Sequence, residues 1–217
     1  MKPKPEITKE CVERVFDSKF IRVFDLQYAE GAHYFDATRH DIGDLAAVKT
    51  DEEFRHMLPD AVSICLILKI DGREPLLLLS QEYRYPAGQF LLSPPAGLLD
   101  PEDCAEEDPL RTAAVREIRE ETGIIVKDTD TVSVINPLLF SSPGMTDESN
   151  ALVCVTVSLE DLDCLTRDNA EGTECFEDFV LLTKEEAGEV LKNGRDSDGK
   201  FYSVYTWAVL IHFVWNS

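Results

Sequence analysis

The stretch "REIREETG", Arg116 to Gly123, places three glutamates within little more than one turn of a predicted helix. At ~100° per residue, Glu117, Glu120 and Glu121 project from one arc of this helix, where like charges repel one another. The adjoining arc carries the residues expected to face a core: Ala114, Val115, Ile118 and Thr122. A purely solvated acidic face would have no reason to border a core. Bound hard cations such as Mg²⁺, which prefer carboxylate oxygens, explain the cluster better.

The helix that carries this stretch has a start signal and a stop signal. Asp108 can accept hydrogen bonds from the first backbone N–H groups, and Pro109 suits the first helical position. Gly123 suits the left-handed residue that ends many helices. We therefore predict a helix from Pro109 to Thr122.

The charge balance of the chain limits its partners. Among 217 residues, 42 are acidic and 21 are basic, for a formal net charge of −21. A binder of nucleic acid or of an anionic membrane surface needs a basic footprint, so neither partner is expected. An anionic substrate would have to be met by local basic residues or by cations.

The cysteines and the chain ends indicate a cytoplasmic protein. The six cysteines show no CxxC or CxxH spacing, which favours free thiols over a disulfide framework or a zinc site. The first residues, "MKPKPEITKECVERVF", lack the apolar run of a signal peptide. The apolar run Phe201 to Trp215 is shorter than the ~20 residues of a spanning helix, and a buried terminal helix is expected there.

The middle of the chain reads as a buried sheet with interleaved helices. "AVSICLILKI", a turn at "DGRE" and "PLLLLSQ" predict two paired strands from Ala61 onward. "TVSVINPLLF", "ALVCVTVSL" and "FEDFVLLT" predict further strands, and Lys184 to Asn193 predicts a second helix. Because the elements do not alternate as regular βαβ units, we expect an α+β protein whose mixed sheet lies between helices.

The N-terminal part has a different character. Phe20 to Gln27 and His33 to Arg39 read as a hairpin with a turn at Gly31, followed by a connection from Thr50 to Asp60. The hairpin is poor in core residues and leaves strand edges to cover. We predict a small antiparallel β subdomain over residues 1–58 and the larger domain over residues 59–217.

The segment Gly97 to Ile124 resembles the Nudix box, G-x5-E-x7-R-E-U-x-E-E-x-G-U, where U is apolar. Its second half matches at every specified position, from Arg116 to Ile124. In the first half Asp108 stands where the family has Glu, and ten residues rather than five separate it from Gly97. The resemblance implies a Nudix hydrolase with an α/β/α sandwich, and the departure predicts a longer loop beside its site.

Two further segments are similar to those of the ADP-ribose pyrophosphatase subfamily: "QEYRYPAGQFLLSPPAGLLD", Gln81 to Asp100, and "SSPGMTDES", Ser141 to Ser149. The resemblance implies Mg²⁺- or Mn²⁺-dependent hydrolysis of the pyrophosphate bond of ADP-ribose, giving AMP and ribose 5-phosphate. It also implies a homodimer paired through the N-terminal region. The alternatives are a Nudix hydrolase acting on another nucleoside diphosphate sugar or a dinucleotide, and a Nudix-shaped ligand sensor without activity.

The same resemblance assigns roles to single residues. The metal ligands it implies are the three glutamates, with the carbonyl of Ala96 as a further ligand: Ala96, Glu117, Glu120 and Glu121. Arg116 is expected to hydrogen-bond and orient these carboxylates. Glu148 is expected to act as general base or to position the attacking water, with Asp147 as the neighbouring alternative.

Substrate contacts are expected from the segment around Arg84. A guanidinium matches phosphate oxygens, which makes Arg84 the candidate phosphate clamp, although a strand-end surface arginine is the ordinary alternative. Gln81, Glu82, Tyr85 and Gly97 complete the set implied by the resemblance. The aromatic candidates for stacking on an adenine are Tyr28, Tyr34, Phe35 and Tyr85. His40 and Asp41 in "TRHD" are interpreted as ordinary hairpin residues.

Overall fold

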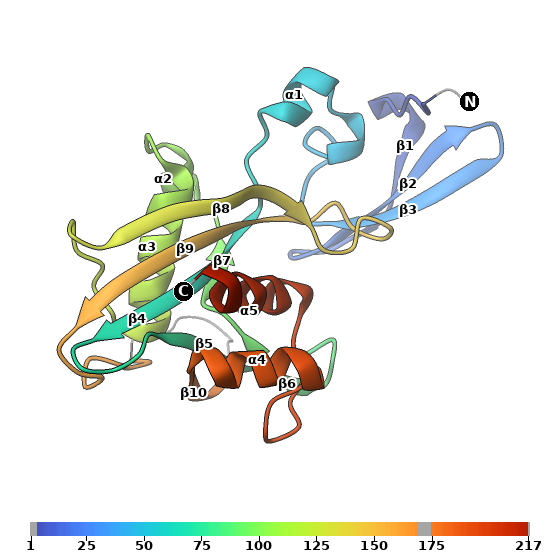
Figure 1. Cartoon of the computed structure of the whole chain (residues 1–217). Helices are drawn as coiled ribbons and strands as arrows, with labels where there is room; N and C mark the ends of the chain where they lie inside the picture. Colours follow the sequence, from blue (N-terminus) through green and yellow to red (C-terminus); the bar gives the residue numbers. More distant parts are fainter. Residues whose placement is uncertain (1–3, 169–174, 217) are drawn as a thin grey trace. The chain divides into compact units, whose positions relative to one another are not determined.

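The computed structural model describes residues 4–168 and 175–216 (Figure 1). The chain divides into two compact units, which are described separately. The smaller unit comprises Met1–Pro59 and Phe140–Ser149, and the larger unit comprises Asp60–Leu139 and Asn150–Ser217. The segment 140–149 groups with the N-terminal residues.

The larger unit is built on a mixed seven-stranded sheet. Its strands are β4 (Ala61–Ile70), β5 (Leu76–Arg84), β6 (Gln89–Ser93), β7 (Ala96–Leu98), β8 (Thr131–Phe140), β9 (Ser149–Leu159) and β10 (Phe176–Leu182). The order is β10-β5-β4-β9-β8, with β6 on β5 and β7 on β4. Strands β4 and β9 are parallel, whereas β4 pairs antiparallel with β5 and β7. The predicted mixed sheet is confirmed.

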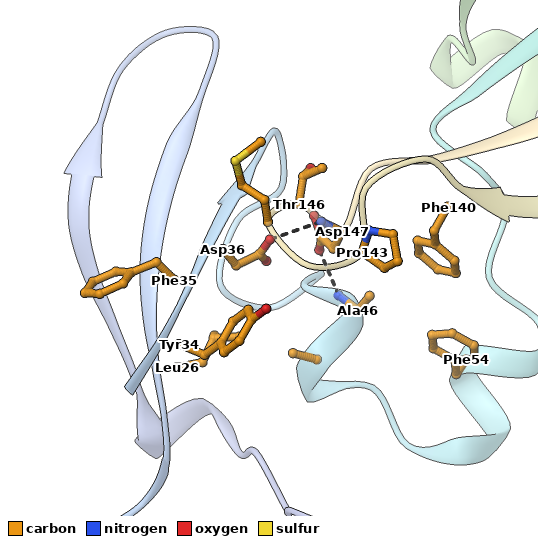
Figure 2. Close-up of a pocket in the computed structure, with 12 residues that line it drawn as sticks. Leu26, Tyr34, Phe35, Asp36, Ala46, Phe54, Phe140, Pro143, Thr146 and Asp147 are labelled. Carbon is orange, nitrogen blue, oxygen red and sulfur yellow. Dashed lines mark hydrogen bonds between the residues drawn. The ribbon is translucent and has the colours of Figure 1, made fainter. Parts of the chain in front are cut away.

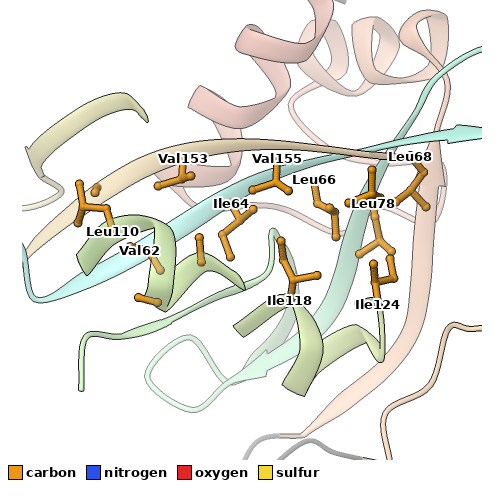
Figure 3. Packing of buried hydrophobic residues seen from close by; sticks show 14 residues of the cluster. Val62, Ile64, Leu66, Leu68, Leu78, Leu110, Ile118, Ile124, Val153 and Val155 are labelled. Carbon is orange, nitrogen blue, oxygen red and sulfur yellow. The ribbon is translucent and has the colours of Figure 1, made fainter. Parts of the chain in front are cut away.

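Helices cover both faces of this sheet (Figure 1). They are α2 (Pro101–Cys104), α3 (Pro109–Thr122), α4 (Lys184–Asn193) and α5 (Val204–Asn216). On one face α3 packs through Ile118 against β4 and β9, and Figure 3 shows Ile118 on the side of the sheet from which Ile64 and Leu66 of β4 project. On the other face α4 and α5 pack through Val190 and Phe213. Because both faces are covered, β4 is buried at nearly every position, as its continuous apolar run predicts.

Helix α3 begins and ends where its sequence predicts. The carboxylate of Asp108 accepts a hydrogen bond from the backbone N–H of Arg111 at 3.2 Å, and Pro109 is the first helical residue. Gly123 ends the helix in the left-handed region, at φ 76°. The Asp that replaces the family's Glu therefore serves as the N-cap of the helix.

The smaller unit contains a three-stranded antiparallel sheet, ordered β1-β2-β3. Its elements are η1 (Lys9–Cys11), β1 (Val12–Asp17), β2 (Arg22–Ala29), β3 (Ala32–Thr38), η2 (Ala46–Val48) and α1 (Asp51–Arg55). A small core gathers around Phe24, Leu26 and Leu45. The predicted hairpin is confirmed as β2 and β3. Strand β1 was not predicted, and the stretch expected to be a plain connection holds α1, which begins with a capping box of Thr50 and Glu53.

The C-terminal apolar run forms a helix, as predicted. Helix α5 buries Val209, Leu210 and Phe213 against the sheet. Within the described ranges, no helix has the length and apolar character needed to cross a membrane. All six cysteines are free thiols.

Candidate active site

Arg116 is the centre of the polar network on α3. Its Nη1 donates to Glu117 Oε1 at 2.7 Å and to Glu120 Oε2 at 3.1 Å. Its Nη2 donates to the backbone carbonyl of Leu98 at 2.9 Å and to Asp103 Oδ2 at 2.7 Å. The predicted contact between Arg116 and the glutamates is thus present, since one guanidinium holds two of the three carboxylates.

Asp103 is a partner that sequence reasoning missed. It lies on the short helix α2, inside the loop that is longer than in the family pattern, and only 2% of its surface is exposed. Its side chain also accepts the backbone N–H of Asp100 at 3.0 Å, which closes a capping box at the start of α2. The signal that could have revealed it is this box, Asp100-Pro-Glu-Asp103. The extra loop therefore supplies the counter-charge of Arg116.

The pKa values of this pair follow from their contacts. Burial disfavours the charged form of Arg116, but the hydrogen bonds and charges of Asp103 and Glu117 outweigh it and raise the pKa of Arg116 above its ordinary value. Burial also disfavours the Asp103 carboxylate, yet hydrogen bonds from Arg116 and from the Asp100 N–H leave its pKa lowered. Both groups remain charged at neutral pH.

Gly97 and Ala96 lie against the glutamates of α3. A Cβ atom on Gly97 would lie 1.9 Å from Glu117 Oε1, so only glycine leaves room for this carboxylate. The backbone N–H of Ala96 donates to Glu121 Oε1 at 3.3 Å. Strand β7 and the second half of α3 are therefore in contact.

The chemical type of these donor atoms, carboxylate oxygens, suits a hard divalent cation. Glu117 and Glu121 are nearly buried, at 8% and 5% exposure, and their oxygens are the ligands that Mg²⁺ prefers. Among the residues that the structure describes, no three His, Cys, Asp or Glu side chains gather as a preformed metal cage. In this arrangement the guanidinium of Arg116 donates hydrogen bonds to the carboxylates of Glu117 and Glu120.

Strand β5 places the residues of the "QEYR" segment on two faces. Glu82 and Arg84 form an ion pair, with Oε2 and Nη2 2.5 Å apart. Burial raises the pKa of Glu82, although Arg84 opposes the shift. Gln81 points to the opposite face, where it accepts a hydrogen bond from Lys200 at 2.7 Å. Tyr85 follows the strand and is 67% exposed, with its ring edge-on to another tyrosine.

The loop with the candidate base lies in the smaller unit. Glu148 is about half exposed, and its Oε2 lies 3.6 Å from Arg39 Nε. Asp147, its neighbour, is buried, and its Oδ2 accepts the backbone N–H of Ala46 at 3.0 Å (Figure 2). Geometry therefore separates the two acids: Asp147 is a structural contact, and Glu148 remains available to solvent.

A cavity of about 300 Å³ lies in the smaller unit beside this loop (Figure 2). Tyr34 and Phe35 line it, and the Tyr34 hydroxyl donates to the carbonyl of Gly144 at 2.9 Å. Phe54 and Phe140 stack in its wall, with ring centroids 6.0 Å apart. Tyr28 is not among its lining residues. Two of the aromatic candidates thus share one cavity.

His40 and Asp41 have hairpin roles in this structure. Asp41 Oδ1 pairs with Arg14 Nη2 at 3.0 Å and lies 3.3 Å from Arg22 Nε. The backbone N–H of His40 donates to the Thr38 hydroxyl at 3.0 Å. These contacts agree with the interpretation of both residues as ordinary parts of the hairpin.

The fold and the glutamate helix together define the family. The sequence matches the NUDIX domain family over residues 57–205, more than half of the chain, and the protein belongs to this family. A solved structure described as that of an ADP compounds hydrolase has a TM-score of 0.53 and 18% sequence identity, covering 93% of this chain and 89% of that chain. This likeness shows the shared fold.

Curated relatives match over part of their length. The ADP-ribose pyrophosphatase of Saccharomyces cerevisiae is 32% identical over 150 residues, 67% of this chain and 61% of the relative. A putative Nudix hydrolase of Caenorhabditis elegans is 36% identical over 132 residues, 59% of this chain and 53% of the relative. The mouse ADP-sugar pyrophosphatase is 27% identical over 125 residues, which are 58% of this chain and 53% of the relative. The chain thus spans about half the length of the curated relatives that it matches.

Proposed function

We propose that this protein hydrolyses the pyrophosphate bond of ADP-ribose, or of a related nucleoside diphosphate sugar, with Mg²⁺ as its cofactor. The observation that carries the proposal is the carboxylate cluster of α3, whose members Glu117 and Glu120 are held by Arg116 next to Gly97. The names of the yeast and mouse relatives support the ADP-linked substrate class.

The residues that would hold the cations are Glu117, Glu120 and Glu121, with the carbonyl of Ala96. When bound, the cations would neutralise the diphosphate and lower the pKa of a coordinated water. Arg116 would keep the carboxylates oriented, because its own position is fixed by Asp103.

Arg84 would bind a phosphate oxygen of the substrate. Its guanidinium side chain is 48% exposed, and its partner Glu82 keeps it in place. A guanidinium fork matches phosphate oxygens, so the substrate would be oriented without any covalent bond to the protein.

Glu148 would accept the proton of the attacking water. The water oxygen then bonds to one phosphorus atom, and the bond from that phosphorus to the bridging oxygen breaks. The bridging oxygen leaves with the other phosphate, giving AMP and ribose 5-phosphate from ADP-ribose. A general base contributes about 10²–10⁴-fold to such a rate.

A homodimer in the cytoplasm is part of the proposal. The N-terminal sheet and the turn between β1 and β2 expose several large apolar side chains: Val15, Phe16, Phe20, Ile21, Tyr34 and Phe35. Burial of such side chains against a second copy would be favourable. Light scattering at micromolar concentration would show twice the monomer mass, and a monomer would contradict this part.

A substrate panel tests the proposal. The purified protein would be incubated with Mg²⁺ and with ADP-ribose, GDP-mannose, NADH or diadenosine diphosphate, and the products separated by chromatography. We expect ADP-ribose to be converted fastest. If ADP-ribose ranks last, the function is hydrolysis of another nucleotide sugar or dinucleotide. If the protein binds these compounds without converting any, it is a ligand sensor.

A further inference from the structure

Strand β5 carries a polar row on the same face as helix α3. Leu78 packs in the core beneath α3, and side chains alternate along a strand. Ser80, Glu82 and Arg84 therefore project from the face that Leu78 shares with α3. The ion pair of Glu82 and Arg84 ends this row.

The chain returns to this face just after strand β9. The backbone N–H of Thr166 donates to the carbonyl of Thr122, the last residue of α3, at 3.0 Å. A Cβ on Gly123 would lie 2.5 Å from Thr166 Cγ2, so the two segments are in close contact. Arg167, the next residue, is therefore anchored beside the end of α3 that carries Glu121.

The guanidinium of Arg167 is held from several directions. Its Nη2 donates to the Ser80 hydroxyl at 3.1 Å, and its carbon lies 4.0 Å from the ring centroid of Phe179 and 4.5 Å from that of Phe176. Two aromatic rings attract the cation and restrict its orientation. Its Nη1 is buried and has no hydrogen-bond partner within residues 4–168 and 175–216. A buried donor without an acceptor is unfavourable, and an anionic ligand would supply one.

The carboxylates of Glu121, Asp178 and Glu82 lie close enough to interact with the charge of Arg167. Both Nη atoms of Arg116 already donate hydrogen bonds, to Glu117 on α3, to the Leu98 carbonyl and to Asp103 on α2. Arg167 keeps a donor that these groups do not use.

We propose that Arg167 binds a non-bridging oxygen of the substrate's diphosphate through Nη1, as a second guanidinium on the face that carries Arg84. This inference rests on the proposed function only for the identity of the substrate. The competing explanation is structural, with Arg167 as a support between strands β5 and β10.

The test separates these two roles. The variants Arg167→Gln and Arg167→Lys would be compared with wild type and with Arg73→Gln, a matched loss of charge at an exposed turn of the same unit. The probe is methylenediphosphonate, a diphosphate analogue that cannot be hydrolysed, titrated calorimetrically in the presence of Mg²⁺. Steady-state kinetics with ADP-ribose and the melting temperature would be measured on the same samples.

Loss of a hydrogen bond from a charged donor is expected to weaken binding of the analogue about tenfold or more in Arg167→Gln. The KM for ADP-ribose should rise by a similar factor, Arg167→Lys should be intermediate, and Arg73→Gln should match wild type. Unchanged affinity for the analogue in Arg167→Gln, with or without a lower melting temperature, would overturn the proposal. If Arg167→Gln does not fold, Arg167→Lys decides, because it keeps the charge between the rings but loses the guanidinium fork.

The proposed substrate and the proposed role of Arg167 can be refuted independently of each other. If wild type does not convert ADP-ribose but Arg167→Gln still binds methylenediphosphonate more weakly, the proposed substrate is wrong and the role of Arg167 stands. If wild type converts ADP-ribose and Arg167→Gln binds and turns over like wild type, the role of Arg167 is wrong and the proposed function stands.

Discussion

The two units each hold acidic side chains close together, but they balance the charge differently. In the larger unit, Glu117 and Glu120 face the guanidinium of Arg116. In the smaller unit, Asp36 Oδ1 accepts the backbone N–H of Asp147 at 3.0 Å, and Asp147 in turn accepts a backbone N–H from η2. The first group is held by one guanidinium, whose own position is fixed by Asp103. The second ties strand β3, η2 and the loop 140–149 together.

The pKa values of acids in the two groups are shifted in opposite directions. The pKa of Asp103, which anchors the arginine of the first group, is lowered. Burial, and then the charge of Asp147, raise the pKa of Asp36 to about 6. The guanidinium of Arg116 thus favours the ionised form of Asp103, whereas at Asp36 the backbone N–H of Asp147 lowers the pKa by less than burial and the charge of Asp147 raise it. Variants in each group should therefore fail in different ways.

The largest effect is expected from Glu121→Gln, which removes one carboxylate of the first group with little change of shape. Turnover should fall by more than the ~10–100-fold typical for loss of an outer-shell partner. The melting temperature should stay unchanged or rise, because repulsion on α3 decreases. Assays across Mg²⁺ concentrations would check this, with Glu106→Gln as the exposed control. Near-normal turnover would eliminate the metal-site assignment.

Asp103→Asn sharpens the comparison by removing the charge that anchors Arg116. We expect the Mg²⁺ concentration for half-maximal activity to rise about 10–100-fold, because the carboxylates lose their fixed partner. Glu102→Gln, on the exposed side of α2, should behave like wild type. Equal Mg²⁺ dependence in all three proteins would show that the longer loop has no part in the site.

Gly97→Ala tests how tightly the first group is packed. The new methyl group would overlap Glu117 Oε1, so the carboxylate must move. We expect a loss of about 1–3 kcal/mol in stability from overpacking, with about tenfold lower activity. Gly188→Ala is the matched control, since a Cβ there meets open space within α4. Identical melting curves and activities for the two variants would refute the predicted clash.

Glu148→Gln and Asp147→Asn separate the two neighbouring acids of the loop. Glu148→Gln should lower kcat at least about tenfold at an unchanged melting temperature, as expected for loss of a general base. Asp147→Asn should mainly lower stability, because Asp147 is buried and holds η2. If Asp147→Asn is the inactive variant and Glu148→Gln is normal, the assignment of the base is wrong by one residue.

The smallest effect is expected from Asp36→Asn, which removes an ionisable group from the second cluster. The native pKa of about 6 exceeds the ordinary 3.8, so the native state binds more protons between these values. Stability should therefore fall as pH rises from about 4 to 6. The variant should lose this decline and gain about 1–2 kcal/mol at pH 7. Chemical unfolding at several pH values would measure it, with exposed Asp128→Asn as control; an unchanged profile would refute the raised pKa.

The sequence predicted what depends on local contacts. Asp108, Pro109 and Gly123 defined both ends of α3, because capping uses residues within one turn. The continuous apolar run from Ala61 to Ile70 defined β4, because both of its faces are buried. The motif also selected the three glutamates and the arginine that contacts two of them.

The rest depended on contacts between distant segments. Asp103 reaches Arg116 across thirteen residues, and Arg167 reaches Ser80 across 87, so no local pattern indicates either pairing, although the capping box marks Asp103 itself. Gln81 and Glu82 were grouped by their place in one segment, but alternation along β5 sends them to opposite faces. Helix α1 is only five residues long, too short for a hydrophobic period to reveal it.

The most direct test of the account is phosphorus NMR of ADP-ribose incubated with the wild-type protein and Mg²⁺ in water enriched in oxygen-18. We predict that the diphosphate signals give way to equal signals of AMP and ribose 5-phosphate. One of these should carry the label, and excess EDTA should stop the reaction. Diphosphate signals that persist with Mg²⁺, or products that form equally fast in EDTA, would contradict a metal-dependent pyrophosphatase built on the glutamates of α3.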